Sequence, residues 1–575
     1  MKIVDKRRSH PPVKRTGKGR LPASVPGSLS EAGTADTPVD SCGAIGERPS
    51  EPDESSASQQ RIVLALWFIA ILYLLSIDLK GAWTDEGYRY ILLSGGQSWG
   101  EANQGSFGSF SDVITAVLRS SQYVPLFYLI DNAVIRIAKS HSDLLLRMVN
   151  LLWVMLSLQG LLRLFRNYSE STRLFAMSLF ALNGFTLMHV MQIREYPLYL
   201  AMQIWSSCLL MEVLELPPNV ARRKGWPLLA GYGGLMGLFF YTQPYAVFTL
   251  AAQVVMAFAR KKNVLGSLRE MALSYVIAAA AITPWIILRL RSGLNVGQWD
   301  SRPHTFAVLL ESFKTGFRSQ LIYNSWAGHP LMQSFVVVVV VGILFAWIFA
   351  VRSGEAPDRR AVYALLTCTF FFIFQVAYFF LNEALSVWPR YFVSYSFGYV
   401  VLATCAFSFL QRSVAKRNQW YWRALPPVIL MFVCISGLQQ VRLYRDDPYF
   451  DTSTSATCNG RGIGLAMLRH IRPEDTVVYY HPLLAWTINV TYPLFPNELS
   501  YSDVADSSKL AGKAVLWVLD TGAVRDYTEQ TLARLRSVNY AVTTTADLSC
   551  GFRLYKLEQP SGPNRVSTEG PQQTH

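Results

Sequence analysis

The feature that most constrains this chain is a series of long apolar runs. The first is RIVLALWFIAILYLLSIDLK, which begins near residue 61 behind a long polar arm. Several such runs reach the length of about 20 residues that an α-helix needs to cross a bilayer. Charged residues make up only 16% of the sequence, whereas an ordinary soluble domain has about 25%. The pattern predicts a polytopic α-helical membrane protein.

About eleven membrane spans are expected from these runs. If the N-terminus is cytoplasmic, the basic residues gather on the inward connections, whereas the short outward connections hold little besides Arg194 and Arg390. This is the positive-inside asymmetry, so the net charge of +14 sets the topology and gives no indication of nucleic acid. An odd number of spans places the C-terminal tail outside. The spans are predicted near residues 62–79, 143–163, 174–190, 197–216, 228–241, 244–259, 271–289, 334–351, 361–381, 391–410 and 425–442.

The chain divides by composition into four parts. Residues 1–60 are rich in Pro, Gly, Ser and charge and predict a disordered cytoplasmic arm. The transmembrane module follows, and after it the pattern changes to that of a small α/β domain outside the membrane. Its predicted strands are near TVVYYH, AVLWVLD and FRLYKLE, and its predicted helices are near GIGLAMLRHI and TEQTLARLRSV. The boundaries we expect are 1–60, 61–443 with outward loops 80–142 and 290–333, 444–560, and a disordered tail 561–575. Within the first outward loop, YVPLFYLIDNAVIRIAK contains Asp131 and Arg136 and predicts an amphipathic helix on the membrane surface.

Cysteine usage separates the two halves of the chain. Four cysteines fall within predicted spans, where cysteine behaves as a small hydrophobic residue. Cys458 and Cys550 both lie in the predicted outward domain, which is an oxidising environment if the topology holds. They are a candidate disulfide pair, although the sequence alone does not show the distance between them.

Two adjacent acids, Asp85 and Glu86, stand in AWTDEGYRY just after the first span. One interpretation is structural, because Thr84 is a good N-cap and acids in the first helical turn complement the helix dipole. The other is catalytic, because a carboxylate at the membrane boundary can act as a general base towards a hydroxyl. Both interpretations stay open, since one residue can do both.

Two arginines lie on separate short outward connections. Arg194 occurs in QIREYPLYL and Arg390 in VWPRYFVSY. Arginine at membrane depth is costly and usually has a partner or a task; its planar fork suits phosphate. Pairing of Arg194 with Glu195 and snorkelling of Arg390 to the interface are the structural alternatives. The outward histidines show no metal-ligand spacing, so no metal site is predicted.

These residues, in this order, resemble the GT-C superfamily of polyprenyl-phosphate-sugar glycosyltransferases, in the branch that includes bacterial protein O-mannosyltransferases and the aminoarabinose transferase of lipid A. The motifs are WTDEGY after the first span, QYVPLFYLI, DLLLRMVNLLW, IREYPLYLA and PRYFVSYSFGYV, which together cover roughly residues 60–410. The resemblance implies a GT-C fold of about eleven transmembrane helices with an extracytoplasmic domain. It also implies a multi-pass protein of a bacterial inner membrane whose active site faces the periplasm.

The resemblance implies a role for each candidate residue. Asp85, beside Glu86, would take the proton of an acceptor hydroxyl, which attacks the anomeric carbon in a single inverting displacement. Arg194 and Arg390 would bind the phosphate of the departing polyprenyl carrier, and Tyr196 and Tyr391 would contact substrate. No cofactor is required; a divalent cation near Asp85 is compatible with the acidic pair. The partners implied are the lipid-linked donor, a protein, lipid or glycan acceptor, and the bilayer, and the sequence fixes no oligomeric state.

Other functions are weighed against this one. A transporter or flippase without chemistry is expected to show matched halves with Gly- or Pro-broken spans, and no such matching is visible, although Pro244 and Pro284 interrupt spans. A polysaccharide polymerase or ligase does not require the acidic pair. A non-catalytic scaffold leaves Asp85, Arg194 and Arg390 without a reason to occur on outward turns.

Overall fold

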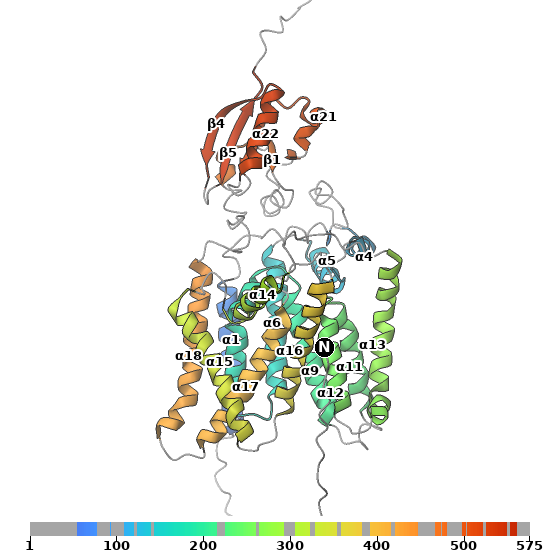
Figure 1. Cartoon of the computed structure of the whole chain (residues 1–575), viewed down its shortest axis with the longest axis vertical. Coiled ribbons are helices and arrows are strands. Elements are labelled where there is room, and N and C mark those ends of the chain that lie inside the picture. The colour runs from blue at the N-terminus through green and yellow to red at the C-terminus, as the bar shows by residue number, and fades with distance from the viewer. Residues whose placement is uncertain are drawn as a thin grey trace, which may run out of the picture. The chain divides into compact units, whose positions relative to one another are not determined.

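The computed structural model describes the helices of the apolar part and most of the sheet of the C-terminal domain (Figure 1). The chain divides into two units, Met1–Glu54 and Ser55–His575. Nearly all described residues belong to the second unit. The described residues are 54–76, 92–93, 108–119, 123–139, 143–215, 225–259, 264–292, 305–322, 328–352, 358–381, 392–415, 420–446, 466–472, 474–479, 497–501, 503–520, 525–548 and 552–560.

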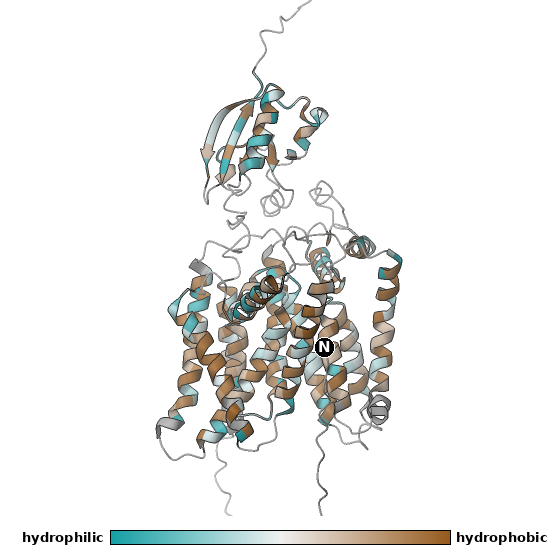
Figure 2. Cartoon of the chain, in the orientation of Figure 1, coloured by the Kyte–Doolittle hydropathy of each residue, from teal (hydrophilic) through white to brown (hydrophobic). Residues whose placement is uncertain are grey.

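The apolar part is a bundle of α-helices, as predicted. Figure 2 shows that most residues of these helices are hydrophobic. The expected polytopic helical fold is therefore confirmed. The helices are α1 (Glu54–Leu74), α4 (Phe110–Arg119), α5 (Leu126–Ala138), α6 (Asp143–Leu164), α7 (Glu170–Ala181), α8 (Gly184–Met191), α9 (Tyr196–Glu215), α11 (Trp226–Phe240), α12 (Ala246–Ala259), α13 (Val264–Ser292), α14 (Phe306–Ser319), α15 (Pro330–Arg352), α16 (Arg359–Leu381), α17 (Val393–Ala415) and α18 (Trp420–Asp446).

Each predicted span coincides with a helix or with a pair of helices, but the expected count of spans is not confirmed. Within the described ranges, six helices are long and apolar enough to cross a membrane, or up to seven if α7 and α8, bent by 54°, form one broken span. Two further apolar helices, α11 and α12, have only 15 and 14 residues. The apolar parts of α1 and α15 that are fully described, residues 58–74 and 330–345, are also shorter than the span length. The amphipathic helix expected near residue 130 is α5, which has 13 residues and is too short to span.

Close helix packing depends on small residues, as is usual between membrane helices. A Cβ added at Gly233 of α11 would lie 2.4 Å from the carbonyl oxygen of Ser274 in α13. Across the α6–α9 contact, the Trp205 indole N–H donates to the Leu156 carbonyl at 2.8 Å. The helix axes are therefore held together by backbone contacts as well as by side chains.

One end of the bundle carries an ion-pair network. Arg163, at the end of α6, binds Glu212 of α9 through two hydrogen bonds of 2.7 and 2.8 Å. Arg166 reaches the same carboxylate at 3.5 Å, and Arg360 of α16 lies 3.3 Å from Glu215. This is the end to which the positive-inside pattern assigns the cytoplasm, and several of its arginines also tie helices together.

The C-terminal domain contains the expected α/β elements. Its sheet has the order β2-β1-β3-β5-β4, with β1 parallel to β2 and β3, and β5 antiparallel to β3 and β4. The three predicted strands are present as β1, β3 and β5, and the predicted helix near residue 530 is α22. The elements are β1 (Thr476–Tyr479), β2 (Asn497–Ser500), η3 (Asp503–Ala505), α21 (Ser507–Leu510), β3 (Val515–Asp520), α22 (Arg525–Ser537), β4 (Ala541–Asp547) and β5 (Arg553–Glu558).

Candidate active site

The turn before α9 carries Arg194, and the preceding helices determine its shape. The Asn183 side chain caps α8 by accepting a hydrogen bond from the Thr186 backbone N–H at 2.7 Å. At the other end α8 stops at Met191, because Gln192 has an extended backbone. The backbone N–H of Arg194 then donates to the Gln192 carbonyl at 2.9 Å. A tight turn therefore links the bent α7–α8 pair to α9.

The Arg194 side chain is buried within this turn. Its Cζ lies 5.5 Å from the centre of the Tyr196 ring, and its Nη2 is 3.5 Å from the Tyr196 hydroxyl. Its Nε is 3.8 Å from Glu195 Oε2, and the two charged side chains are only 7% and 8% exposed. Buried charges at membrane depth are costly unless they are paired. The structure thus brings the predicted residues Arg194 and Tyr196 together with a carboxylate.

Neighbouring helices hold the turn in place through buried polar groups. The Asn150 side-chain amide of α6 donates to the Gln192 carbonyl at 2.5 Å. His189 Nδ1 lies 3.1 Å from Gln192 Oε1, and the His189 ring is 4.4 Å from the Tyr196 ring. All four of these residues are at least nine-tenths buried. The position of Arg194 is therefore fixed by contacts to α6 and α8.

The segment that follows the acidic pair in sequence packs against the same region. Leu92 and Leu93 are buried in one hydrophobic cluster with Ile193 and Leu198, which flank Arg194. The Asn132 side chain of α5 donates to the Leu93 carbonyl at 3.2 Å. The chain just after the acidic pair is thus anchored beside the turn that carries Arg194.

The start of α17, which follows Arg390 in sequence, lies against the start of α9. The hydroxyls of Tyr199 and Ser394 are hydrogen-bonded. Thr249 of α12 joins them, with its hydroxyl 3.2 Å from that of Tyr199, and the Gln203 amide donates to the same threonine at 3.2 Å. Two segments that are far apart in the sequence, each next to a predicted phosphate-binding arginine, therefore meet at their first helical turns.

A cavity of about 300 Å³ opens between α14, α16 and α17. In the part of the chain that the structure describes, the Tyr395 and Tyr399 hydroxyls have no hydrogen-bond partner. The cavity begins within two turns of the start of α17, so it is close in sequence to Arg390. It is lined by Phe317, Gln320, Cys368, Thr369, Phe372, Tyr395, Tyr399 and Leu402.

The other predicted site residues lie outside the described residues. The described cysteines of the spans are free. Within the described ranges, no group of three His, Cys, Asp or Glu side chains is placed to hold a metal ion. The residues outside the description are Asp85, Glu86, Arg390, Tyr391, Cys458 and Cys550, and their roles stay predictions.

Sequence reasoning did not assign a role to several buried polar residues around the turn. Asp131 of α5 and Arg147 of α6 are each only 1% exposed, and Asn150 is fully buried. A polar side chain inside an apolar run is the signal that could have identified them, because such residues are costly in a membrane unless they have a partner. Asp131 was expected on the polar face of a surface helix, and it instead faces the protein interior.

The fold of this chain is shared with a solved structure, which confirms the expected fold class. The chain is similar to the crystal structure of ArnT from Cupriavidus metallidurans in the apo state, with a TM-score of 0.53, 13% identity, and coverage of 87% of this chain and 98% of that chain. Because the sequence identity is only 13%, the structural similarity establishes the fold alone. No family model matches the sequence, and no curated protein matches it either.

Two further structures give weaker matches. One is ArnT from Cupriavidus metallidurans bound to undecaprenyl phosphate, with a TM-score of 0.49, 12% identity, and coverage of 89% of this chain and 100% of that chain. The other is the Archaeoglobus fulgidus oligosaccharyltransferase in complex with zinc and sulfate, with a TM-score of 0.47, 11% identity, and coverage of 80% of this chain and 67% of that chain.

Proposed function

We propose that this protein is a membrane glycosyltransferase that moves a sugar from a polyprenyl-phosphate carrier to a hydroxyl of a protein, lipid or glycan. The observation that carries the proposal is the buried Arg194, held on a tight turn in a fold shared with ArnT. A guanidinium fixed by its surroundings stabilises a phosphate that gains charge as it leaves, and needs no reorganisation during the reaction. Arg390, which precedes the neighbouring first turn of α17, is the second candidate for this role.

The proposed chemistry is one inverting displacement. The acceptor hydroxyl gives its proton to Asp85 as its oxygen attacks the anomeric carbon. The bond between that carbon and the phosphate oxygen breaks, and the electron pair leaves with the polyprenyl phosphate. Glu86 orients Asp85 in this proposal. A divalent cation at the acidic pair is not needed, because the arginines neutralise the charge of a monophosphate.

Two supporting roles follow from the described geometry. Tyr196 is fully buried against Arg194 and His189, so we propose that it positions the arginine. Tyr391 lies outside the described residues, and we propose its contact to the substrate from the sequence alone. The aromatic cavity beside α17 suits the first isoprene units of the carrier, since its lining is mostly apolar with a few hydroxyls.

The cellular site is also a proposal. We place the protein in the inner membrane of a bacterium, with the N-terminus in the cytoplasm and the C-terminal domain in the periplasm. The ion-paired basic end of the bundle supports this orientation, because basic connections stay in the cytoplasm.

The test is deletion of the gene followed by complementation at equal membrane abundance. Wild type is expected to restore a defined sugar mass on an envelope glycan, lipid or protein, measured by mass spectrometry, whereas Asp85→Asn is not. Asp112→Asn is the matched control, because Asp112 is an exposed acid at the start of α4 that binds Ser109. Full restoration by Asp85→Asn would remove Asp85 as the base. A deletion that changes no glycan would favour a transporter.

A further inference from the structure

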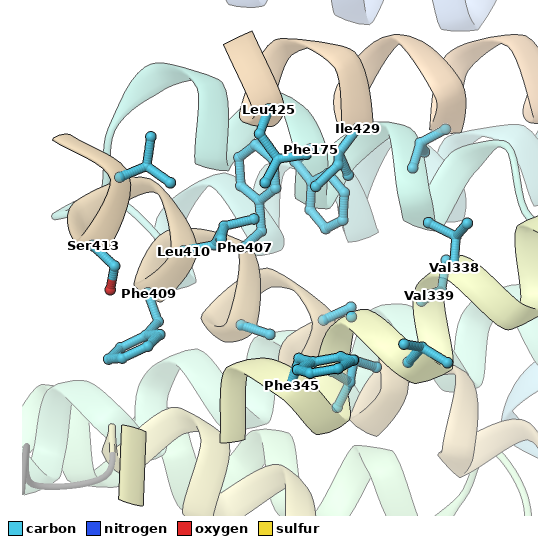
Figure 3. A pocket seen from close by; sticks show the side chains of 17 residues that line it. Phe175, Val338, Val339, Phe345, Phe407, Phe409, Leu410, Ser413, Leu425 and Ile429 are labelled. Atoms are coloured by element: carbon cyan, nitrogen blue, oxygen red, sulfur yellow. The ribbon is translucent and has the colours of Figure 1, made fainter. Parts of the chain in front are cut away.

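A second cavity lies between helices α7, α15, α17 and α18 (Figure 3). Its volume is about 560 Å³, within the range of about 300–1,000 Å³ typical of ligand pockets. The rings of Phe175 and Phe407 stack at one wall, with their centres 4.3 Å apart. The remaining wall is formed by residues such as Val339, Phe345 and Ile429. The proposed transferase chemistry makes no use of this cavity.

The cavity is remote from the candidate active site. The hydrogen bond between Tyr199 and Ser394 places the Arg194 turn at the beginning of α17. The cavity residues of α17 run from Ala403 to Val414, which is about 14 to 30 Å further along the axis at ~1.5 Å per residue. The cavity therefore belongs to the opposite half of the bundle, the half with the basic helix ends.

The lining indicates a hydrocarbon ligand. Of the lining residues, Ser413 alone has a polar side chain, and Figure 3 shows its hydroxyl near the end of α17. A cavity with so few polar groups does not hold water stably. Val338, Val341 and Phe345 line it and are also exposed at the bundle surface. The cavity therefore opens to the side of the bundle. In a membrane, this side is surrounded by lipid chains.

The charges at the nearby helix ends indicate the headgroup. Arg352 is in the last turn of α15, Arg412 is near the end of α17, and Arg423 is near the start of α18. All three are exposed, and in the described parts of these three helices that end carries no carboxylate. The fourth cavity helix, α7, begins there with Glu170, which is paired with Arg61. Basic side chains at a membrane surface attract anionic lipids. A hydrocarbon cavity whose helices carry three arginines at one end is complementary to a lipid with an anionic headgroup.

We propose that this cavity binds an acyl chain of an anionic phospholipid from the leaflet at the basic end. The donor's polyprenyl chain is the alternative occupant, and the geometry disfavours it. Its phosphate would be held at Arg194, beside the first turn of α17, whereas the three arginines lie at the other end of the cavity helices and attract anionic lipid there. The phospholipid serves as a bound structural partner of α15, α17 and α18.

The first test uses the wild-type protein in nanodiscs and needs no variant. The probe is phosphatidylglycerol with a photoactivatable diazirine at the middle of one acyl chain. After illumination, mass spectrometry is expected to find crosslinks on the cavity segments of α15 and α17 (338–345 and 403–414). Phosphatidylcholine with the same chain is expected to give at least tenfold less. Equal labelling by both lipids would overturn the anionic specificity, and labelling spread evenly over the bundle surface would overturn the site.

Gly342 gives a matched pair of variants. It lines the cavity, and a Cβ added there meets nothing within 4 Å. Gly342→Phe is expected to cut phosphatidylglycerol crosslinking at least tenfold. Gly231→Phe is the control, because an added Cβ at Gly231 of α11 also meets nothing within 4 Å and that residue lies outside the cavity. Both variants replace a glycine within a helix, so changes in helix propensity are matched. Unchanged labelling of Gly342→Phe would refute the assignment.

The headgroup has its own test. Arg412→Gln is expected to reduce the preference for phosphatidylglycerol over phosphatidylcholine, whereas Arg291→Gln, an exposed arginine in the last turn of α13, is expected to leave it unchanged. Undecaprenyl phosphate is added as a competitor: loss of the phosphatidylglycerol crosslinks at equimolar competitor would assign the cavity to the carrier and overturn the proposal. None of these measurements uses sugar transfer, so they stand or fall separately from the proposed function.

Discussion

The pairing of Arg194 with Glu195 allows a structural role to be separated from a catalytic one. Both side chains are more than nine-tenths buried, with 3.8 Å between Nε and Oε2. Three variants make the separation: Arg194→Gln, Glu195→Gln, and the double variant with both changes. Each single change leaves one buried charge without this partner, whereas the double change removes both charges.

The stability of these variants follows from charge burial. Breaking a buried ion pair by removing one partner costs about 3–5 kcal/mol, because the remaining charge stays desolvated. We therefore expect Arg194→Gln and Glu195→Gln each to lose stability on this scale. The double variant regains most of the loss, because two neutral amides replace the pair. Thermal unfolding of the purified protein in nanodiscs measures this directly.

The rate of sugar transfer is expected to behave differently. If Arg194 stabilises the departing phosphate, its removal costs about 10²–10³ in kcat, as for a single donor to a developing oxyanion. The double variant is then folded but still slow. Arg194→Lys keeps the charge and loses the planar fork, so we expect a rate between those of wild type and Arg194→Gln. The assay is single-turnover transfer from a polyprenyl-phosphate sugar to the acceptor that the glycan comparison identifies.

Two results would refute this reasoning. A double variant that transfers sugar at nearly the wild-type rate would show that Arg194 serves only to neutralise Glu195. A double variant that is no more stable than Arg194→Gln would show that the pair does not account for the cost of burial.

Three further changes test the surroundings of the site and the bundle. Asn150→Ala removes one of the two hydrogen bonds to the Gln192 carbonyl, the other being that of the Arg194 backbone N–H; we expect ~0.5–1.5 kcal/mol lower stability and a lower kcat, measured by thermal unfolding and single-turnover transfer. Gly398→Ala places a Cβ 2.3 Å from the Cys368 sulfur, so a loss of ~1–3 kcal/mol from overpacking is expected, and Cys368→Ala should restore the melting temperature. Glu212→Gln breaks the bidentate pair with α6 at a partly exposed site and should cost about 1 kcal/mol.

Hydrophobic pattern was sufficient to predict where the helices of the spans lie, whereas α4 and α14, in the predicted outward loops, were not predicted. Each predicted span coincides with a helix or with the bent α7–α8 pair, because membrane insertion depends mainly on the length and apolarity of a run. The number of spans was less predictable. The apolar helices α11 and α12 have only 15 and 14 residues, and a run of hydropathy does not show where a helix ends or bends.

In the α/β domain, too, some elements were predicted from the sequence and others were not. The strands β1, β3 and β5 were predicted because they are apolar and β-branched or aromatic. The strand β2 has the sequence NELS and β4 the sequence AVTTTAD, and both were missed. Their positions at the two edges of the sheet explain this, because an edge strand buries less of its surface and needs fewer apolar residues.

The candidate site depends on contacts that no linear pattern contains. Sequence reasoning selected Arg194 from its location on a short outward turn, and the structure supplies Asn150 and His189 as the groups that hold this turn. Polar residues within apolar runs were the only available signal for them. Their common purpose became visible only when α6, α8 and α9 were packed together.

The polar face of α9 explains how this packing is specified. Tyr199 and Gln203 are one helical turn apart, and Ser207 follows one turn later. Tyr199 and Gln203 bind Thr249 of α12, and Ser207 donates to the Tyr363 hydroxyl of α16 at 3.0 Å. In an apolar environment a helix rotated by one residue would leave these groups unsatisfied. The hydrogen bonds of Tyr199, Gln203 and Ser207 therefore fix the rotation of α9 about its axis. They thereby also fix the direction in which the guanidinium of Arg194 points.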